Sequence, residues 1–137
     1  MLIFATSDAD GAGRSVTSAN LAYRHSLQGG DSAYLDFNFG SPTSGTIFDL
    51  PEEIRFGVDD GGMHSYLLGH VPEPRRVDVW AETQREALRY HPAGAGRIML
   101  LPGYSGKREF QSTAEIVDAC TERWSGWMRS SASSSSI

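Results

Sequence analysis

The stretch L-I-F-A-T-S-D-A-D-G-A-G-R-S-V, residues 2–16, decides the predicted fold of this 137-residue chain. Residues 2–6 form a short apolar run, which is typical of a buried strand. Residues 7–13 consist of Ser, Asp, Ala and Gly, a composition that favours a loop. Apolar or small residues recur at helical spacing over residues 14–27, and Gly29-Gly30 supplies the stop. The stretch therefore predicts a strand, a glycine-rich loop and a helix of about four turns.

The rest of the chain extends this pattern. Residues 32–37 read as a second strand, so strand, loop, helix and strand together predict a βαβ crossover. Residues 97–101 read as a third buried strand, and residues 112–124 as a final helix with Ser112 or Thr113 as its N-cap. The segments between them predict mostly loop over 39–62, a short helix over 63–68, and a strand followed by a helix within 72–96.

Composition places the chain among single-domain globular proteins, with 39% hydrophobic and 21% charged residues. The formal net charge of −5 disfavours direct nucleic-acid binding, which usually needs a basic face. One cysteine, Cys120, forms no internal disulfide, and no His/Cys cluster has the spacing of a zinc site. We therefore expect a cytoplasmic protein without a membrane-spanning segment. The four histidines are expected on the surface or on helix faces.

The loop before the first helix has the composition of a phosphate-binding loop. Such a loop wraps backbone N–H groups around a phosphate, with glycines where side chains would collide and a helix N-terminus behind them. Gly11 and Gly13 stand where this requires, and Arg14 and Ser15 occupy the positions of the usual Lys and Ser/Thr. As an alternative, the same residues form a strand-to-helix turn that binds no ligand.

The order of these features resembles the ParA/MinD family of P-loop ATPases. That family has the loop K-G-G-x-G-K-[ST], an N-L-A segment on the first helix, and a second strand that ends D-x-D-P. Here Asn20-Leu21-Ala22 lies on the predicted helix, Asp36-Phe37-Asn38 ends the second strand, and Leu100-Leu101-Pro102 is similar to the family's strand ending L-L-P. The resemblance covers about the first fifty residues well.

The resemblance implies an incomplete three-layer α/β domain of the P-loop NTPase type with a mainly parallel sheet. It implies ATP and Mg²⁺ as cofactors, a nucleotide-dependent homodimer, and a role in partitioning or positioning cargo. Ser15 and Asp36 would hold the metal, and Asn38 stands at the family's second acidic position. The residues implied to contact the nucleotide are Asp10, Gly11, Ala12, Gly13, Arg14, Ser15 and Val16.

Four departures from the family pattern predict a weakened site. The signature Lys falls on Ala9, the first family Gly on Asp10, and the loop Lys on Arg14. Asp8 and Asp10 would repel a polyphosphate, which lowers the expected affinity for ATP. An amide at Asn38 can hold a water molecule but cannot accept its proton, so hydrolysis is expected to be slow.

A Walker B strand, a hydrophobic run ending in Asp, is missing after residues 112–124. Residues 1–128 are therefore predicted to form a partial P-loop domain, and the serine-rich residues 129–137 a disordered tail. We also expect a truncated or frame-shifted copy, because GC-rich serine codons shifted by one base would encode four valines followed by Asp. Three hypotheses remain: an ATP-dependent switch, a nucleotide-independent interaction module, and a non-functional fragment.

Overall fold

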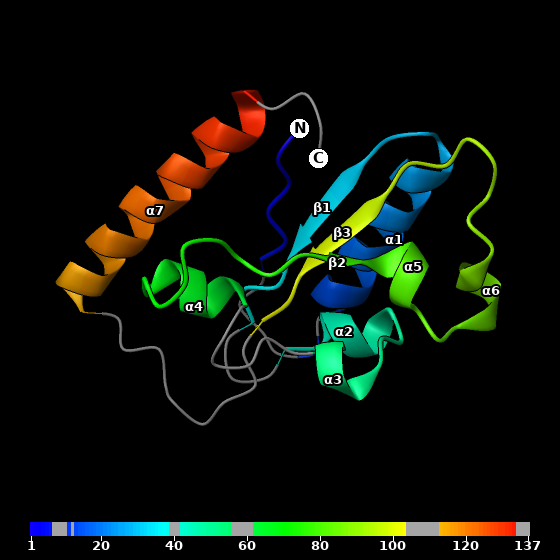
Figure 1. Cartoon of the computed structure of the whole chain (residues 1–137), viewed down its shortest axis with the longest axis horizontal. Coiled ribbons are helices and arrows are strands. Elements are labelled where there is room, and N and C mark those ends of the chain that lie inside the picture. The colour runs from blue at the N-terminus through cyan, green and yellow to red at the C-terminus, as the bar shows by residue number, and fades with distance from the viewer. Residues whose placement is uncertain (7–10, 12, 39–41, 56–61, 104–112, 134–137) are drawn as a thin grey trace.

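The computed structural model describes residues 1–6, 11, 13–38, 42–55, 62–103 and 113–133. Residues 131–133 are described by their backbone alone. Over these residues the chain has a mixed α/β fold, in which helices surround one small sheet (Figure 1). In chain order the elements are α1 (Arg14–Leu27), β1 (Ser32–Leu35), α2 (Ser44–Ile47), α3 (Glu52–Arg55), α4 (Met63–Leu67), β2 (Val77–Asp78), α5 (Val79–Glu82), α6 (Glu86–Arg89), β3 (Ile98–Leu101) and α7 (Ala114–Ser133).

The sheet has three strands in the order β1-β3-β2 and is mixed. β1 runs parallel to β3, with Ser32 opposite Ile98 and Leu35 opposite Leu101. β2 runs antiparallel to β3, with Val77 opposite Leu100. The prediction of a mainly parallel sheet is therefore met only by the β1–β3 pair. β2 is short because Asp78 ends it: its carboxylate accepts hydrogen bonds from the Trp80 and Ala81 amides in the first turn of α5 and so starts that helix.

The predicted first strand is absent, because residues 1–6 form no strand. Leu2, Ile3 and Phe4 are 50%, 58% and 69% exposed. An apolar run becomes a strand only where a neighbouring strand can take its backbone hydrogen bonds, and sequence periodicity does not supply that neighbour. The expected βαβ crossover therefore lacks its first strand.

The first helix agrees with the prediction at both ends. α1 begins at Arg14 and ends at Leu27, where the N–H groups of Gln28, Gly29 and Gly30 donate to carbonyls of the last turn.

Two short helices, α2 and α3, lie in the segment predicted as mostly loop. The final helix starts as expected, with the Ile116 amide donating to the Thr113 hydroxyl at 3.3 Å. It continues to Ser133 and so takes in part of the predicted disordered tail, whose residues 134–137 lie outside the described part.

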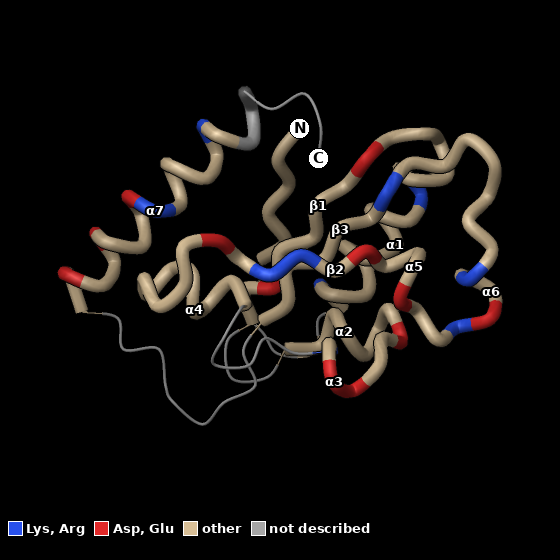
Figure 2. The backbone as a smooth tube through the Cα atoms, in the orientation of Figure 1, with Lys and Arg blue, Asp and Glu red and all other residues tan. Residues whose placement is uncertain are grey.

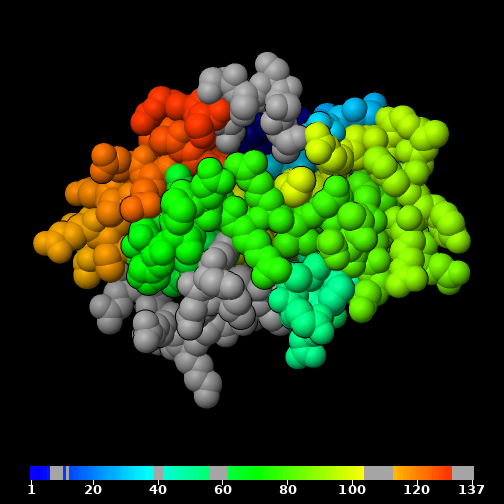
Figure 3. All heavy atoms as spheres, viewed as in Figure 1, coloured from blue at the N-terminus to red at the C-terminus, as the bar shows by residue number. Residues whose placement is uncertain are grey.

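Apolar side chains pack on both faces of the sheet, as alternation along a strand requires. One cluster joins β2 and β3 to α1, α5 and the segment around α2, and its buried members are Ala19, Phe48, Leu50, Val77, Val79, Trp80, Ile98 and Leu100. A second cluster on the other face joins β3 to α4, with members Met63, Tyr66, Leu67 and Leu101 and half-buried residues of α7 against them. Figure 3 shows α7, in orange and red, lying against the green surface of α4. No helix of the described part is long and apolar enough to cross a membrane.

Candidate functional site

The predicted phosphate loop ends at a backbone that only glycine adopts easily. Gly11 and Gly13 both have φ of 73°, in the left-handed region. A Cβ atom added at either position would meet no heavy atom within 4 Å, so crowding by the protein is not the reason for glycine there. Gly13 is the N-cap of α1 and has no side chain to cap it. Among the described residues, therefore, nothing crowds the Cβ side of either glycine.

The start of α1 lies at the carboxyl ends of the parallel strands. α1 leads into β1 through the tight turn at Gly29, so the helix runs back along the strand and its first turn meets the strand's last residues (Figure 1). The hydroxyl of Tyr34 donates to the carbonyl of Ser15 at 3.3 Å, which fixes this approach. Ligands of α/β proteins bind outside the carboxyl ends of parallel strands. The structure thus brings Ser15 to the same edge of the sheet as Asp36.

Asp36 is buried at 5% exposure and holds the segment that follows β1. One carboxylate oxygen accepts the Asn38 amide at 3.0 Å, and the other accepts the Ser44 amide at 3.1 Å and the Ser44 hydroxyl at 2.6 Å. Asp36 thereby caps α2 from eight residues away. A Cβ atom at Gly103 would come within 3.0 Å of the Asp36 carbonyl oxygen, so the chain after β3 passes close to this site. The predicted metal role of Asp36 did not include these internal partners.

Tyr34 lies between the helix and the acidic group. Burial raises the pKa of Tyr34, and the nearby charge of Asp36 raises it further, whereas hydrogen bonds with Ser15 and Ser18 act in the opposite direction. Tyr34 and Asp36 are two positions apart, so their side chains leave the same face of the sheet. The ring of Tyr34 meets Phe48 edge-on, with centroids 5.4 Å apart. Sequence analysis missed this tyrosine, although its place two residues before Asp36 on a strand is a usable signal.

The remaining predicted residues divide by position. Arg14 and Ser15 are half-buried, Val16 is exposed, and Asn38 is exposed with its backbone amide bonded to Asp36. Asp10 and Ala12 lie outside the described residues, as do Asp8 and Ala9. Among the described residues, no three His, Cys, Asp or Glu side chains gather as a metal-binding group. Figure 2 shows acidic and basic positions interspersed over the described elements.

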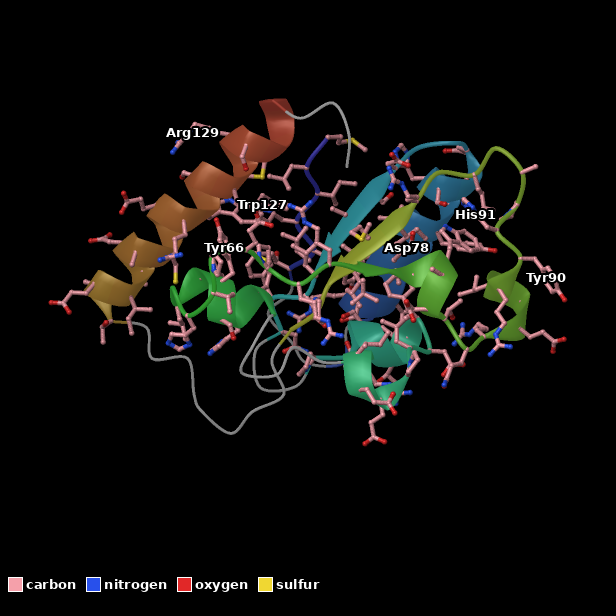
Figure 4. The ribbon with its side chains drawn as sticks, in the orientation of Figure 1. Tyr66, Asp78, Tyr90, His91, Trp127 and Arg129 are labelled. Carbon is pink, nitrogen blue, oxygen red and sulfur yellow. The ribbon has the colours of Figure 1, made fainter. Side chains whose placement is uncertain are left out.

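A second polar cluster closes the opposite end of α1. The buried Ser26 donates its hydroxyl to the Gly96 carbonyl, and the Trp80 indole N–H donates to Ser26 Oγ at 3.0 Å and to the Gly96 carbonyl at 3.1 Å. The His91 ring lies tilted against Trp80, with centroids 5.0 Å apart, and its Nε2 lies 3.2 Å from the same carbonyl (Figure 4). This cluster ties α1 to the turn before β3. Sequence analysis did not single out Ser26 or Gly96.

The histidines were predicted on the surface or on helix faces, and His64 is a helix residue that is buried. It lies on α4 at 5% exposure, and burial lowers the pKa of its imidazole, with a smaller contribution from nearby His70. The α4–α7 contact around it is mainly aromatic, and Figure 4 shows Tyr66 and Trp127 between these helices. We therefore assign His64 to packing.

No protein-family model, curated protein or solved structure matches the chain. The resemblance to the ParA/MinD family therefore rests on the residues of the loop, the first helix and the second strand. Family membership stays a prediction.

Proposed function

We propose that the start of α1 binds ATP together with Mg²⁺, as a degenerate member of the ParA/MinD type of P-loop protein. The observation that carries this proposal is the pair Gly11 and Gly13, both at φ of 73° and both open to space, directly before a 14-residue helix. A helix N-terminus offers unpaired amides and a partial positive charge, which suit a phosphate group. The carboxyl ends of β1 and β3 lie beside it.

Gly13, Arg14, Ser15 and Asp36 each have a role in this proposal. The amides of Gly13 and the first turn would receive the phosphate oxygens, and the charge of Arg14 would offset part of the phosphate charge. Ser15 and Asp36 offer a hydroxyl and a carboxylate, which are hard oxygen ligands of the kind that Mg²⁺ takes. When bound, Mg²⁺ would neutralise charge that the protein leaves uncompensated. These residue types suit the cofactor, although the Asp36 carboxylate also accepts three hydrogen bonds from its own chain.

Weak binding and slow hydrolysis are part of the proposal. Asp8 and Asp10 add negative charge near the polyphosphate, at a cost on the order of 1 kcal/mol for each close contact. Ala9 replaces the Lys that in the family reaches the partner's phosphates, which weakens a nucleotide-dependent homodimer. Asn38 cannot act as a base toward water. The family role, an ATP-driven dimerisation switch for partitioning or positioning cargo, is proposed here in this weakened form.

The fold proposed for this function is an incomplete three-layer P-loop domain. Helices on both faces of the sheet support it, because such domains place their sheet between two helical layers. The unpaired residues 1–6 count against a complete sheet.

One observation favours a second function, a nucleotide-independent interaction module. The Asp36 carboxylate already accepts three hydrogen bonds from its own chain, so the fold uses this group without any ligand. A carboxylate has about four acceptor positions, which leaves little capacity for a metal or its water shell. In this alternative the loop keeps its shape while the site no longer binds ATP.

Isothermal titration calorimetry with ATP and Mg²⁺ separates the two functions. We expect saturable binding by the wild type and a loss of about tenfold in affinity for Arg14→Ala, which removes a charge-assisted contact. Arg24→Ala is the matched control, because Arg24 is exposed in the last turn of the same helix and should bind as the wild type does. An absence of heat above buffer at millimolar nucleotide would exclude the ATP function and leave the interaction module and the non-functional fragment.

A further inference from the structure

β1 is an edge strand that uses only one side of its backbone. In the sheet order β1-β3-β2, β3 covers one edge of β1, and no strand of the described part covers the other. The amides of Ser32 and Asp36 donate toward β3, at 2.8 Å and 3.1 Å. Because backbone groups alternate in direction along a strand, Ala33 and Leu35 direct their N–H and C=O groups to the uncovered edge. The described residues provide no partner for these groups.

The uncovered edge carries none of the features that usually prevent strands from pairing there. Natural edges are protected by Lys, Pro or bulges. Ser32–Leu35 contains no charged residue and no Pro, and its register with β3 is regular. The two flanking carboxylates are used by the chain itself, since Asp31 accepts the Arg97 amide at 2.8 Å and Asp36 accepts Ser44. The edge is therefore open to an added uncharged strand.

Residues 1–6 have the composition of such a strand but no place in the sheet. Figure 1 draws them, in dark blue, as a coil outside the three arrows. Their side chains are uncharged, and they include Ile3, Phe4 and Thr6, which favour strands. All six residues are exposed, with Phe4 at 69%. Apolar side chains exposed in this way gain free energy when another surface covers them.

We propose that residues 2–6 of one copy of this chain add as a strand to the uncovered edge of β1 in a second copy. Each chain carries both the added segment and the accepting edge, so a twofold arrangement forms two identical contacts and closes as a homodimer. Main-chain hydrogen bonds give such strand addition its affinity. The segment of five residues is long enough for the four residues of β1. This homodimer needs no nucleotide, unlike the dimer of the proposed function.

The charge of the chain explains why uncharged segments would make the contact. Each copy carries a formal net charge of −5, so two copies repel one another at long range. Neither residues 2–6 nor β1 adds a charged side chain to this repulsion. Salt screens the repulsion and leaves backbone hydrogen bonds and apolar contact in place. We therefore expect the homodimer to become tighter as the salt concentration rises.

Sedimentation equilibrium of the full chain in EDTA, without nucleotide, measures this association. We expect the dimer fraction of the wild type to rise with chain concentration and with salt. Ile3→Lys places a charge in the added segment. Ala33→Pro removes an N–H group from the accepting edge and leaves the hydrogen bonds to β3 intact, as Pro is tolerated where the N–H faces outward. Each variant should weaken the dimer by about tenfold or more.

Val117→Lys is the matched control for the added charge. Val117 is 46% exposed and lies on α7, outside both segments, so its dimer should stay within about twofold of the wild type. Melting temperatures of all the variants show whether a change alters folding.

A mixture of Ile3→Lys and Ala33→Pro separates strand exchange from general adhesion between apolar surfaces. The Ala33→Pro chain still offers an intact residues 2–6, and the Ile3→Lys chain still offers an intact edge. One of the two contacts therefore remains in a heterodimer. We expect the mixture to associate more strongly than either variant alone.

Amide hydrogen exchange on the wild type tests the edge without any substitution. The amides of Ala33 and Leu35 should gain protection as the chain concentration rises. The amides of Ser32 and Asp36 should change little, because they already donate toward β3.

Four results would overturn the strand exchange. These are a wild type that stays monomeric at every concentration and salt, an equal loss in Ile3→Lys and Val117→Lys, a mixture no stronger than its components, and concentration-independent exchange at Ala33 and Leu35. A dimer that forms only with ATP also overturns it and supports the nucleotide-dependent switch instead. Calorimetry with ATP measures the proposed function separately, so the two can fail independently.

Discussion

The two ends of α1 use glycine for opposite reasons. At the start, a Cβ atom at Gly11 or Gly13 would meet nothing within 4 Å. At the other end, a Cβ atom at Gly96 would overlap the carbonyl oxygen of Gly30, and Ser26 and Trp80 close the space around it. The end of α1 is closed by the protein's own contacts. At its start, the described residues leave the Cβ side of Gly11 and Gly13 uncovered.

This difference separates residues that serve stability from residues that serve binding. A closed end buries its polar groups and pairs them, which stabilises the fold. At the open end, the positive φ is taken by glycines without strain, and their Cα atoms make no close packing contact with the described residues. We therefore expect substitutions at the two ends to affect different measurements.

The largest effect should come from Gly96→Ala at the closed end. The new methyl group would collide with backbone atoms that cannot move alone, so we expect a loss of about 3 kcal/mol in the free energy of unfolding. Denaturant unfolding followed by circular dichroism measures it. Gly126→Ala is the control, because Gly126 lies within α7 with nothing within 4 Å, and it should gain about 1 kcal/mol from better helix propensity. A loss of less than about 0.5 kcal/mol for Gly96→Ala would show that the closed end is not tightly packed.

A smaller loss of stability is expected from Gly13→Ala at the open end. Alanine at φ of 73° costs about 1 kcal/mol, because its Cβ crowds the backbone in the left-handed region. The affinity for ATP should fall by about tenfold, since the methyl group occupies the space proposed for phosphate. Calorimetry on the folded variant measures the affinity separately from stability. An affinity for ATP that is unchanged although stability falls would show that the space beside Gly13 does not hold the phosphate.

The helices and strands with strong local signals were predictable from the sequence. Residues 14–27 combine helical periodicity with a glycine stop, and β1 and β3 are apolar runs bounded by turn residues. The glycine pair and Asp36 were singled out because their spacing follows a known pattern, and their binding role stays a prediction. These features depend on residues that are close along the chain.

The features that the sequence did not predict depend on distant residues. α2 starts where Asp36 caps it from eight positions away, and Ser26 meets Gly96 across seventy positions. The apolar residues 2–6 had the composition of a strand, but their pairing depends on a neighbour that composition does not reveal. The contact of Tyr34 with Ser15 was missed for the same reason, since it exists only after the helix folds back on the strand.

Backbone amide chemical shifts during a titration with ATP and Mg²⁺ test the open end most directly. Gly94 provides an internal reference: its φ of 81° and its open surroundings match those of Gly11 and Gly13, but it lies near the closed end, next to Gly29. We predict saturable shifts at Gly11, Gly13 and Ser15, and none at Gly94. Unshifted amides at Gly11 and Gly13 with millimolar nucleotide, or equal shifts at Gly94, would contradict a phosphate site at the start of α1.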